Sequence, residues 1–370
     1  MHSFLFVALA FLLSAGITAL IIPKIILISF KRKLFDEVDE RKVHQGIVPR
    51  LGGVAFTPAI VMSMAVLLGL YTLLSGTTGI NMTMAPTLAL CLCALMLLYL
   101  EGITDDLIGV EYKVKFVCQI LSALLIVVSG VWINDFNGLL GIHEIPWYVG
   151  MPFTTVLIVY VINAINLIDG IDGLASGLSL VALFFLGCLL SLNGDVISAV
   201  IAFATVGTLV PFFIYNVFGR AEKHRKIFMG DCGSQTIGLI LGMLAVKFSM
   251  SDAAYMASLP NPLVIAFSVL MIPCLDVIRV MIGRIRKGKN PFLPDKTHIH
   301  HKFLALGMSH RTAMVTILMI DAFFVMLNLG MVVFLDINVV LLIDIVMWCG
   351  MHTWINKMVV KINRSKNTIG

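Results

Sequence analysis

Charge is scarce in this sequence. Only 13% of the 370 residues are charged, against roughly 25% in an ordinary soluble domain, whereas 59% are hydrophobic. These figures exclude a conventional water-soluble enzyme and also a disordered, fibrous or nucleic-acid-binding chain. The seven cysteines include no CxxC pair, so we expect neither disulfides nor a thiolate metal site.

Apolar runs long enough to cross a bilayer, which takes about 20 residues, are abundant instead. We predict an all-α polytopic membrane protein with eleven transmembrane helices, built as a single membrane domain over residues 1–370. The first run has no basic segment before it, so we expect an anchor and not a cleaved signal peptide. The expected spans are residues 3–30, 51–74, 85–101, 115–133, 152–168, 174–193, 196–218, 234–250, 261–283, 312–334 and 337–357.

The basic residues predict the orientation of these spans. All but three of the 26 Lys and Arg residues lie in the connections after odd-numbered spans or in the tail after the last one. The positive-inside rule then places the amino terminus outside and the carboxyl terminus in the cytoplasm. The cytoplasmic connections are residues 31–50, 101–115, 169–173, 219–233 and 284–312. The outer connection 134–151 is expected to form a hairpin, with Trp147 and Tyr148 at the interface.

Acidic and amide side chains cluster at the cytoplasmic ends of the spans, and carboxylates at membrane depth tend to mark function. Asp105 and Asp106 are adjacent at the end of a span, where their repulsion costs stability unless a cation or a catalytic need offsets it. A solvated helix end is the plainer interpretation of this pair. Asp231 lies in a glycine-flanked turn before another span, where it suits either metal binding or a simple helix cap.

A second polar run, residues 163–177, contains glycines that permit tight turns and close backbone approach. In it Asn163, Asn166 and Asp169 recur every three residues, so they share one side of a helix that continues that far. Asp172 follows directly. Polar contacts between helices are the alternative explanation for such a run.

Basic and imidazole groups lie in the same connections. Arg50, before a glycine pair, and Lys115, at the start of a span, are placed to hold phosphates. His298, His300 and His301 suggest a transition-metal site first, but no further ligands are evident nearby. These histidines also suit pyrophosphate oxygens and a sugar, which we prefer.

Acidic residues, histidines and basic residues that can bind phosphate are thus all expected on one face of the membrane. Scattered carboxylates with substrate phosphates suit Mg²⁺ better than zinc, with Mn²⁺ as an alternative. The expected reaction is phosphoryl transfer from a soluble cytoplasmic donor to an acceptor phosphate in the inner leaflet.

The motifs resemble those of the polyprenyl-phosphate N-acetylhexosamine-1-phosphate transferases. The resemblance runs from about residue 40 to 312 and is carried by Asp105-Asp106-Leu, residues 163–175, Met229-Gly-Asp231-Cys-Gly-Ser and His298-Ile-His300-His301. It implies transfer of a sugar-1-phosphate from a UDP-N-acetylhexosamine to undecaprenyl phosphate with release of UMP, in the bacterial cytoplasmic membrane with the active site facing the cytoplasm. Membrane lipid is an expected partner and nucleic acid is not; a homodimer stays open.

The resemblance also implies roles for individual residues. Asp231 would bind magnesium with Asn166 as second ligand, and Asp105 would be the base that deprotonates the lipid phosphate, supported by Asp106 and Asp169. For the nucleotide sugar, Asp172 would contact the uracil, Lys115 the diphosphate, and His298, His300 and His301 the diphosphate and sugar. Arg50 and His44 are our candidates for the lipid phosphate. Direct attack and an aspartyl-phosphate intermediate both stay open, as does the choice between Asp105 and Asp106 as base.

The histidine segment and the eleventh span resemble the branch that uses UDP-GlcNAc to begin the O antigen, enterobacterial common antigen or wall teichoic acid. The peptidoglycan branch, which uses UDP-MurNAc-pentapeptide, typically has ten spans. A UDP-deoxy-N-acetylhexosamine is a further alternative donor. A transporter or flippase for the polyprenyl lipid is the rival from another class, but it should hold its ionisable residues near the bilayer midplane.

Overall fold

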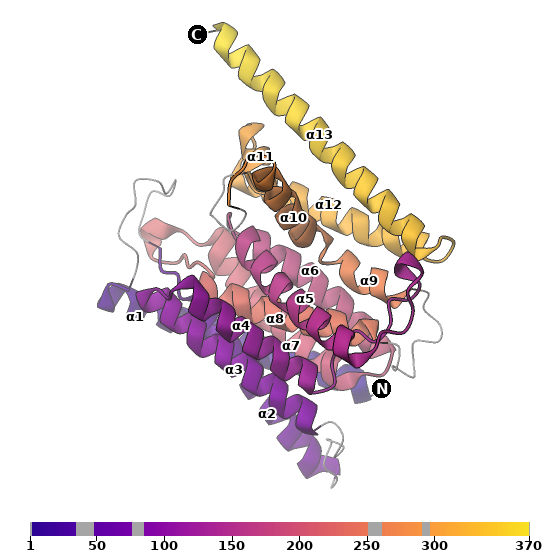
Figure 1. The fold of residues 1–370 in the computed structure, drawn as a ribbon. Helices are drawn as coiled ribbons and strands as arrows, with labels where there is room; N and C mark the ends of the chain where they lie inside the picture. The colour runs from indigo at the N-terminus through magenta and orange to yellow at the C-terminus, as the bar shows by residue number, and fades with distance from the viewer. Residues whose placement is uncertain (1, 35–47, 76–84, 251–260, 291–296, 370) are drawn as a thin grey trace.

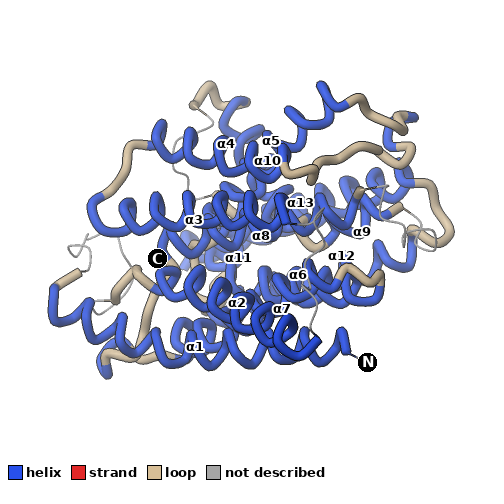
Figure 2. The backbone as a smooth tube through the Cα atoms, turned by 90° about the horizontal axis from the view of Figure 1, so that it is seen from below, coloured by secondary structure: helices blue, strands red, loops and turns tan. Residues whose placement is uncertain are grey.

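The regular secondary structure of the residues that the structure describes is almost entirely helical. The computed structural model describes residues 2–34, 48–75, 85–250, 261–290 and 297–369, and within them the sole strand-like pairing is one bridge between Asp135 and Glu144. The α-helices are α1 (His2–Arg32), α2 (Phe56–Ser75), α3 (Ala85–Ile108), α4 (Tyr112–Val128), α5 (Trp147–Ile168), α6 (Leu174–Leu192), α7 (Val196–Phe213), α8 (Gly230–Ser249), α9 (Pro262–Ser268), α10 (Met271–Ile285), α11 (Ile299–Ala305), α12 (His310–Met331) and α13 (Ile337–Ile369). Short helical turns are η1 (Gly52–Ala55), η2 (Leu139–Gly141), η3 (Ile214–Phe218) and η4 (Ala221–Lys223). The predicted all-α fold is confirmed (Figure 2).

The apolar helices occupy the eleven predicted positions. Among the described residues, nine helices are long and apolar enough to cross a membrane, and the bent pair of α9 and α10 makes a tenth candidate. The remaining predicted position is taken by α4, whose 17 residues extend about 25 Å. The protein is therefore a multi-pass membrane protein, as predicted.

The predicted span 261–283 is broken. Its two parts, α9 and α10, meet at an angle of 78°. Pro273 lies in the first turn of α10 and has no N–H to continue a helix from the preceding residues, so a helix begins more easily here than it passes through.

Several helices also end later, or begin earlier, than the sequence predicted. α3 runs to Ile108 and not 101, α8 begins at Gly230 and not 234, and α13 continues to Ile369 and not 357 (Figure 1). Polar residues ended the predicted spans, but a helix can extend past its apolar stretch into water. Asp105, Asp106 and Asp231 consequently lie within helices, where their relative positions are fixed.

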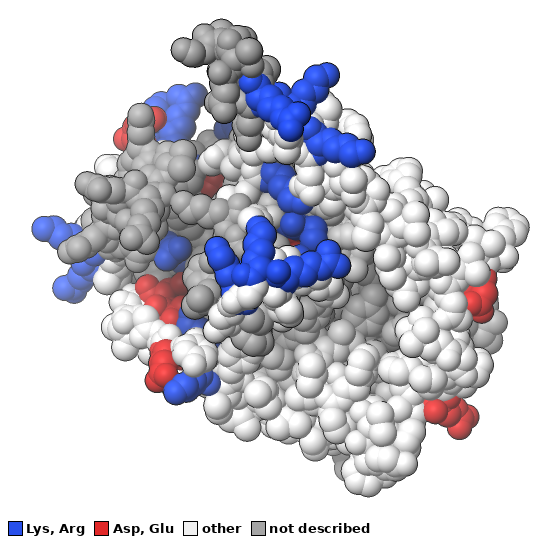
Figure 3. Space-filling model, turned by 45° about the horizontal axis from the view of Figure 1, so that its top comes forward, with Lys and Arg blue, Asp and Glu red and all other residues white. Residues whose placement is uncertain are grey.

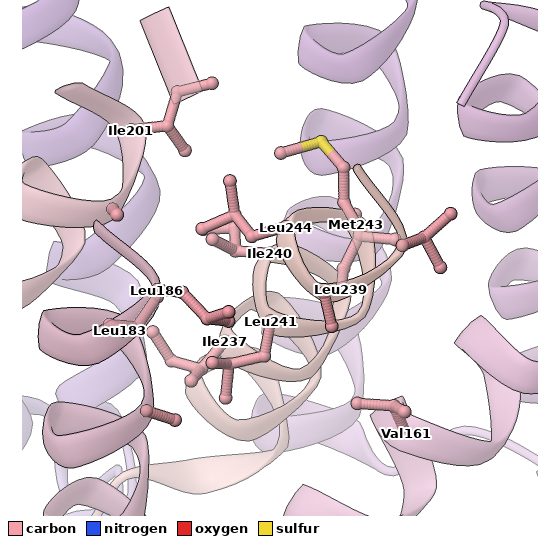
Figure 4. Packing of buried hydrophobic residues seen from close by; sticks show 14 of the residues in the cluster. Val161, Leu183, Leu186, Ile201, Ile237, Leu239, Ile240, Leu241, Met243 and Leu244 are labelled. Carbon is pink, nitrogen blue, oxygen red and sulfur yellow. The ribbon is translucent and has the colours of Figure 1, made fainter. Parts of the chain in front are cut away.

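α8 is the central helix of the bundle, and 94% of its most apolar 18-residue stretch is buried. Its glycines allow close packing: a Cβ at Gly238 would lie 2.6 Å from Ile162 Cα, so α5 approaches the α8 backbone directly. On its other faces, Ile237 and Leu244 belong to the apolar cluster that also contains Leu186 of α6 (Figure 4). This packing fixes the amino-terminal end of α8 relative to its neighbours.

The connection between α4 and α5 forms the predicted hairpin. The Phe136 N–H donates to the His143 carbonyl at 3.1 Å, and the Ile145 N–H donates to the Asn134 carbonyl at 2.8 Å. Trp147 and Tyr148, which follow, are 65% and 64% exposed. Amphipathic rings at such positions suit a membrane interface.

Lysine and arginine gather toward one end of the molecule. In Figure 3 the blue side chains occupy the upper, left and central parts of the view, and the lower right surface is white except for two acidic groups. The concentration of basic residues in one set of connections is thus visible in space. That this end faces the cytoplasm stays a prediction from the positive-inside rule.

Candidate active site

Glycines bring three chain segments together at one end of the bundle. A Cβ at Gly53 in η1 would overlap the backbone of Gly233 in α8, and one at Gly102 in α3 would overlap the backbone of Cys232. The N–H of Gly53 also donates to the Met229 carbonyl at 2.8 Å. The segment before α2, the end of α3 and the start of α8 therefore share one small region.

Asp106 holds the first turn of α8. Its Oδ1 accepts the N–H of Asp231 at 2.8 Å, and its Oδ2 accepts the N–H of Cys232 at 3.1 Å. These N–H groups have no partner within the helix and favour negative charge nearby. Gly230, with φ of +74°, makes the tight turn that brings Asp231 to this carboxylate.

Lys115 of α4 joins the two other acids of the site. Its Nζ lies 2.5 Å from Asp105 Oδ2 and 2.7 Å from Asp231 Oδ2. The side chains of Asp105 and Asp231 are 12% and 33% exposed, so water reaches both carboxylates in part. Asp105, Asp106 and Asp231 each offer an oxygen within 4.8 Å of the others, a spacing at which they could hold a metal ion.

A network of amides continues from the acids into the interior. Asn166 Nδ2 donates to Ser234 Oγ at 2.8 Å. Asn163 Nδ2 donates to Gln119 Oε1 at 2.7 Å, and Gln119 Nε2 donates to Gln235 Oε1 at 3.0 Å. Buried amides need such partners, and here they tie α4 and α5 to α8 directly beneath the carboxylates.

The residues after α5 form the second acidic part of the site. Partial desolvation, with the charges of Asp172 and Asp231, raises the pKa of the Asp169 carboxyl against the opposing effect of Arg50, although the residue is exposed to water. Asp172 pairs with Lys226 Nζ at 2.5 Å. Both groups are 15% exposed, so Asp172 is held in place by a neighbouring cation.

The histidine segment lies against this loop. A Cβ at Gly170 would overlap the His300 ring, so the absence of a side chain there permits the contact. The rings of His300 and His301 have centroids 4.1 Å apart. His300 is 2% exposed, and its burial, with the nearby charges of His301 and His298, lowers its pKa to about 3. His300 is therefore a neutral imidazole at physiological pH.

The structure thus brings most of the predicted residues together. Asp105, Asp106, Asp231 and Lys115 form one cluster, Asn166 reaches it through Ser234, and Arg50 acts on Asp169. The histidines join through Gly170. His44 lies outside the described residues.

Four residues escaped the sequence-based prediction of the site. Glu101 is 7% exposed on α3, near Gln235 and Lys115. Lys226 holds Asp172, and Asp276 and Arg279 on α10 contact the histidine segment. The spacing of an Asp and an Arg three residues apart in an apolar span was a signal for the last pair; the first two depend on contacts between distant segments.

Known proteins show the same sequence pattern. Residues 87–249 match glycosyl transferase family 4. The undecaprenyl-phosphate alpha-N-acetylglucosaminyl 1-phosphate transferase of Yersinia pestis is 30% identical over 307 residues, 81% of this chain and 78% of that protein.

Two further relatives come from other bacteria. The probable undecaprenyl-phosphate N-acetylglucosaminyl 1-phosphate transferase of Bacillus subtilis is 31% identical over 86% of this chain and 83% of its own. The decaprenyl-phosphate N-acetylglucosaminephosphotransferase of Mycolicibacterium smegmatis is 33% identical over 75% of this chain and 70% of its own.

Proposed function

Because the chain belongs to glycosyl transferase family 4, we propose that it is an enzyme that transfers GlcNAc-1-phosphate from UDP-GlcNAc to undecaprenyl phosphate. The products are UMP and undecaprenyl-pyrophosphoryl-GlcNAc. The observation that carries this proposal is the convergence of Asp105, Asp106 and Asp231 with Lys115 at adjoining helix ends. The names of the three relatives support GlcNAc-1-phosphate as the group transferred and a polyprenyl phosphate as the acceptor.

The carboxylate cluster suits a hard divalent cation. Asp105, Asp106 and Asp231 supply oxygen donors only, which match Mg²⁺ or Mn²⁺ better than softer metals. Asp106 already accepts two backbone N–H groups, so Asp231 is the principal ligand in this proposal, with Asn166 beside it, and Asp105 stays available as the base. When bound, the cation neutralises negative charge on the donor diphosphate.

The reaction needs a nucleophile, a base and a site for the leaving group. An oxygen of the lipid phosphate attacks the phosphorus that carries GlcNAc; the bond from that phosphorus to the bridging oxygen breaks, and UMP departs with this oxygen. Asp105 takes the remaining proton of the lipid phosphate, and Asp106 keeps the first turn of α8 in position. Lys115, placed between Asp105 and Asp231, is also within the region where diphosphate charge would gather. An aspartyl-phosphate route would replace this single displacement by two.

The outer parts of the donor have their own candidate residues. Asp172, fixed by Lys226, is proposed to contact the uracil, and His298, His300 and His301 to contact the diphosphate and sugar. Since His300 is neutral, it acts there as a hydrogen-bonding group and not as a cation. Arg50, and with it Asp169, lies on the side proposed for the lipid phosphate.

The cellular setting belongs to the proposal as well. We place the active site on the cytoplasmic face of a bacterial inner membrane, where UDP-sugars are made, because the basic connections lie at that end. The lipid product would begin a cell-envelope polysaccharide such as O antigen, common antigen or teichoic acid.

A panel of donors tests the substrate assignment. The purified protein is given undecaprenyl phosphate, Mg²⁺ and, one at a time, UDP-GlcNAc, UDP-GalNAc, UDP-MurNAc-pentapeptide or a UDP-deoxy-N-acetylhexosamine, and the lipid products are identified by mass spectrometry. We expect the lipid product of UDP-GlcNAc to form at the highest kcat/KM. A higher value for another donor would contradict the assignment of the sugar while leaving the chemistry intact.

A further inference from the structure

Asp276 is a buried carboxylate that the proposed reaction does not use. It has no solvent exposure within α10, and a buried carboxylate is costly unless it is paired. Arg279, one turn along the same helix, donates to Oδ1 from Nη2 at 2.7 Å and from Nε at 3.2 Å. This ion pair with the partly exposed Arg279 alone would compensate the burial of the Asp276 charge.

The carboxylate nevertheless makes further bonds to a different segment, the start of α11. His298 Nδ1 lies 2.9 Å from Asp276 Oδ2. The backbone N–H of Ile299 donates to the same carboxylate, at 3.1 Å to Oδ1 and 3.2 Å to Oδ2. Arg279 adds a bond from Nη2 to the Thr297 carbonyl at 2.5 Å. Three consecutive residues, 297 to 299, are therefore fixed to α10.

The segment held in this way carries the histidines of the site. α11 begins at Ile299, so the bonds of Asp276 and Arg279 to residues 297–299 fix the point at which this seven-residue helix starts. α11 is also joined to α13, since Lys302 Nζ lies 3.2 Å from His352 Nδ1. Within the described residues the ring nitrogens of His300 are buried without a hydrogen-bond partner. Both nitrogens are therefore available for hydrogen bonds to a bound ligand.

The histidine segment is linked to the acidic loop through α5 as well. Tyr160 of α5 donates its hydroxyl to the Cys274 carbonyl of α10, and α5 ends at the loop whose Gly170 contacts His300. α10 is thus bonded both to α5, which leads into the loop that contains Gly170, and to residues 297–299, which lead into His300. A change in the Asp276 bonds would move one partner relative to the other.

We propose that Asp276 and Arg279 are positioning residues for the donor: they hold the first turn of α11 so that His300 and His301 meet the nucleotide sugar. This inference rests on the proposed function. It assigns to α10 a part in donor binding that is separate from the carboxylates that carry the chemistry. Removal of either residue should weaken donor binding and leave acceptor binding unchanged.

The test is a comparison of KM values for the two substrates in the full-length protein. Asp276→Asn keeps the size of the side chain but loses its charge and directs N–H groups toward His298 and Ile299. We expect the KM for the donor identified by the panel to rise roughly tenfold or more, as for a lost charged hydrogen bond, while the KM for undecaprenyl phosphate stays within about twofold. Asp321→Asn, which alters another fully buried aspartate on α12, is the matched control and should change neither KM.

A double variant separates positioning from a general loss of structure. If Asp276 acts through the histidines, Asp276→Asn combined with His300→Gln should raise the donor KM no more than the stronger single change does. The inference would be overturned if the fold-increases in donor KM of the two single variants multiplied in the double variant. A folded Asp276→Asn protein with an unchanged donor KM would overturn it as well. Should Asp276→Asn fail to fold, Arg279→Lys takes its place, because it keeps the charge and loses the fork that reaches Thr297; an unchanged donor KM in that variant overturns the inference equally. A wild-type protein that releases no UMP with any donor would instead contradict the proposed function.

Discussion

At the level of single residues, a small number of groups balances the negative charges of the three carboxylates in the site. Lys115 satisfies Asp105 and Asp231 at once, and Asp106 is satisfied by two backbone N–H groups. The acids themselves were predictable, because carboxylates beside glycines at span ends stand out in an apolar sequence. Their pairing was not: Lys115 and Asp231 are 116 positions apart in the chain, and only packing of α4 against its neighbours brings them together.

His300 gives a pH dependence of stability. Its pKa is about 3 in the folded protein and near 6.5 when unfolded, so its neutral form stabilises the fold above pH 6.5 and this contribution is lost as the pH falls toward 3. Between pH 7 and pH 5 the loss is about 2 kcal/mol. Thermal unfolding of the wild type and of His300→Gln over this range measures it. The wild type should lose more stability than the variant, and parallel curves would contradict the buried, neutral state of His300.

At the level of helices, glycine contacts decide how the elements meet. The apolar runs predicted where helices lie, but not that α3, α8 and η1 would touch backbone to backbone at Gly102, Cys232, Gly53 and Gly233. A glycine in a sequence signals either flexibility or close packing, and only the neighbouring helix distinguishes them. The break between α9 and α10 was missed for a similar reason, since the run around it is continuously apolar.

Gly102→Ala tests this packing. A Cβ at this position would overlap Cys232, so α3 and α8 must separate, and overpacking of this kind costs about 1–3 kcal/mol. The acids lie within one turn of the contact, so their displacement should raise the activation free energy. A rise of about 1.4 kcal/mol lowers the rate tenfold, and we expect activity to fall by at least roughly this factor. Gly69→Ala on α2 is the control, since nothing lies within 4 Å of its Cβ. Equal melting temperatures and activities for the two variants would argue against the contact.

At the level of the whole molecule, the sequence predicted the class of fold and the sorting of charge. The eleven apolar positions and the all-helical architecture follow from run length, because a backbone in lipid must satisfy its own hydrogen bonds. The anchoring of α11 by Asp276 and Arg279 could not be derived in the same way, since a buried aspartate in a span has many conceivable partners. Global properties were thus more predictable than the contacts that complete the site.

Orientation is testable on the whole chain. α13 ends at Ile369 with Lys357, Lys361 and Arg364 near its carboxyl end, and the positive-inside rule places these residues in the cytoplasm. Green fluorescent protein fused after residue 370 should therefore fluoresce in cells, and alkaline phosphatase at the same place should be inactive. The reverse pair of results would place the candidate site on the outer face and contradict the cytoplasmic assignment.

The central claim is that the carboxylate cluster carries out phosphoryl transfer to a membrane lipid. Its most direct test measures UMP and lipid-linked GlcNAc together, from UDP-GlcNAc, undecaprenyl phosphate and Mg²⁺, for the wild type, Asp231→Asn and Asp195→Asn. Asp195 caps α7 and accepts the Ser198 N–H, a role that asparagine can keep. The wild type and Asp195→Asn should form UMP and lipid product in equal amounts, and Asp231→Asn should lose at least about a hundredfold in rate, as expected when a charge-stabilising group is removed. A wild type that forms no UMP, or an Asp231→Asn protein as active as Asp195→Asn, would contradict the claim.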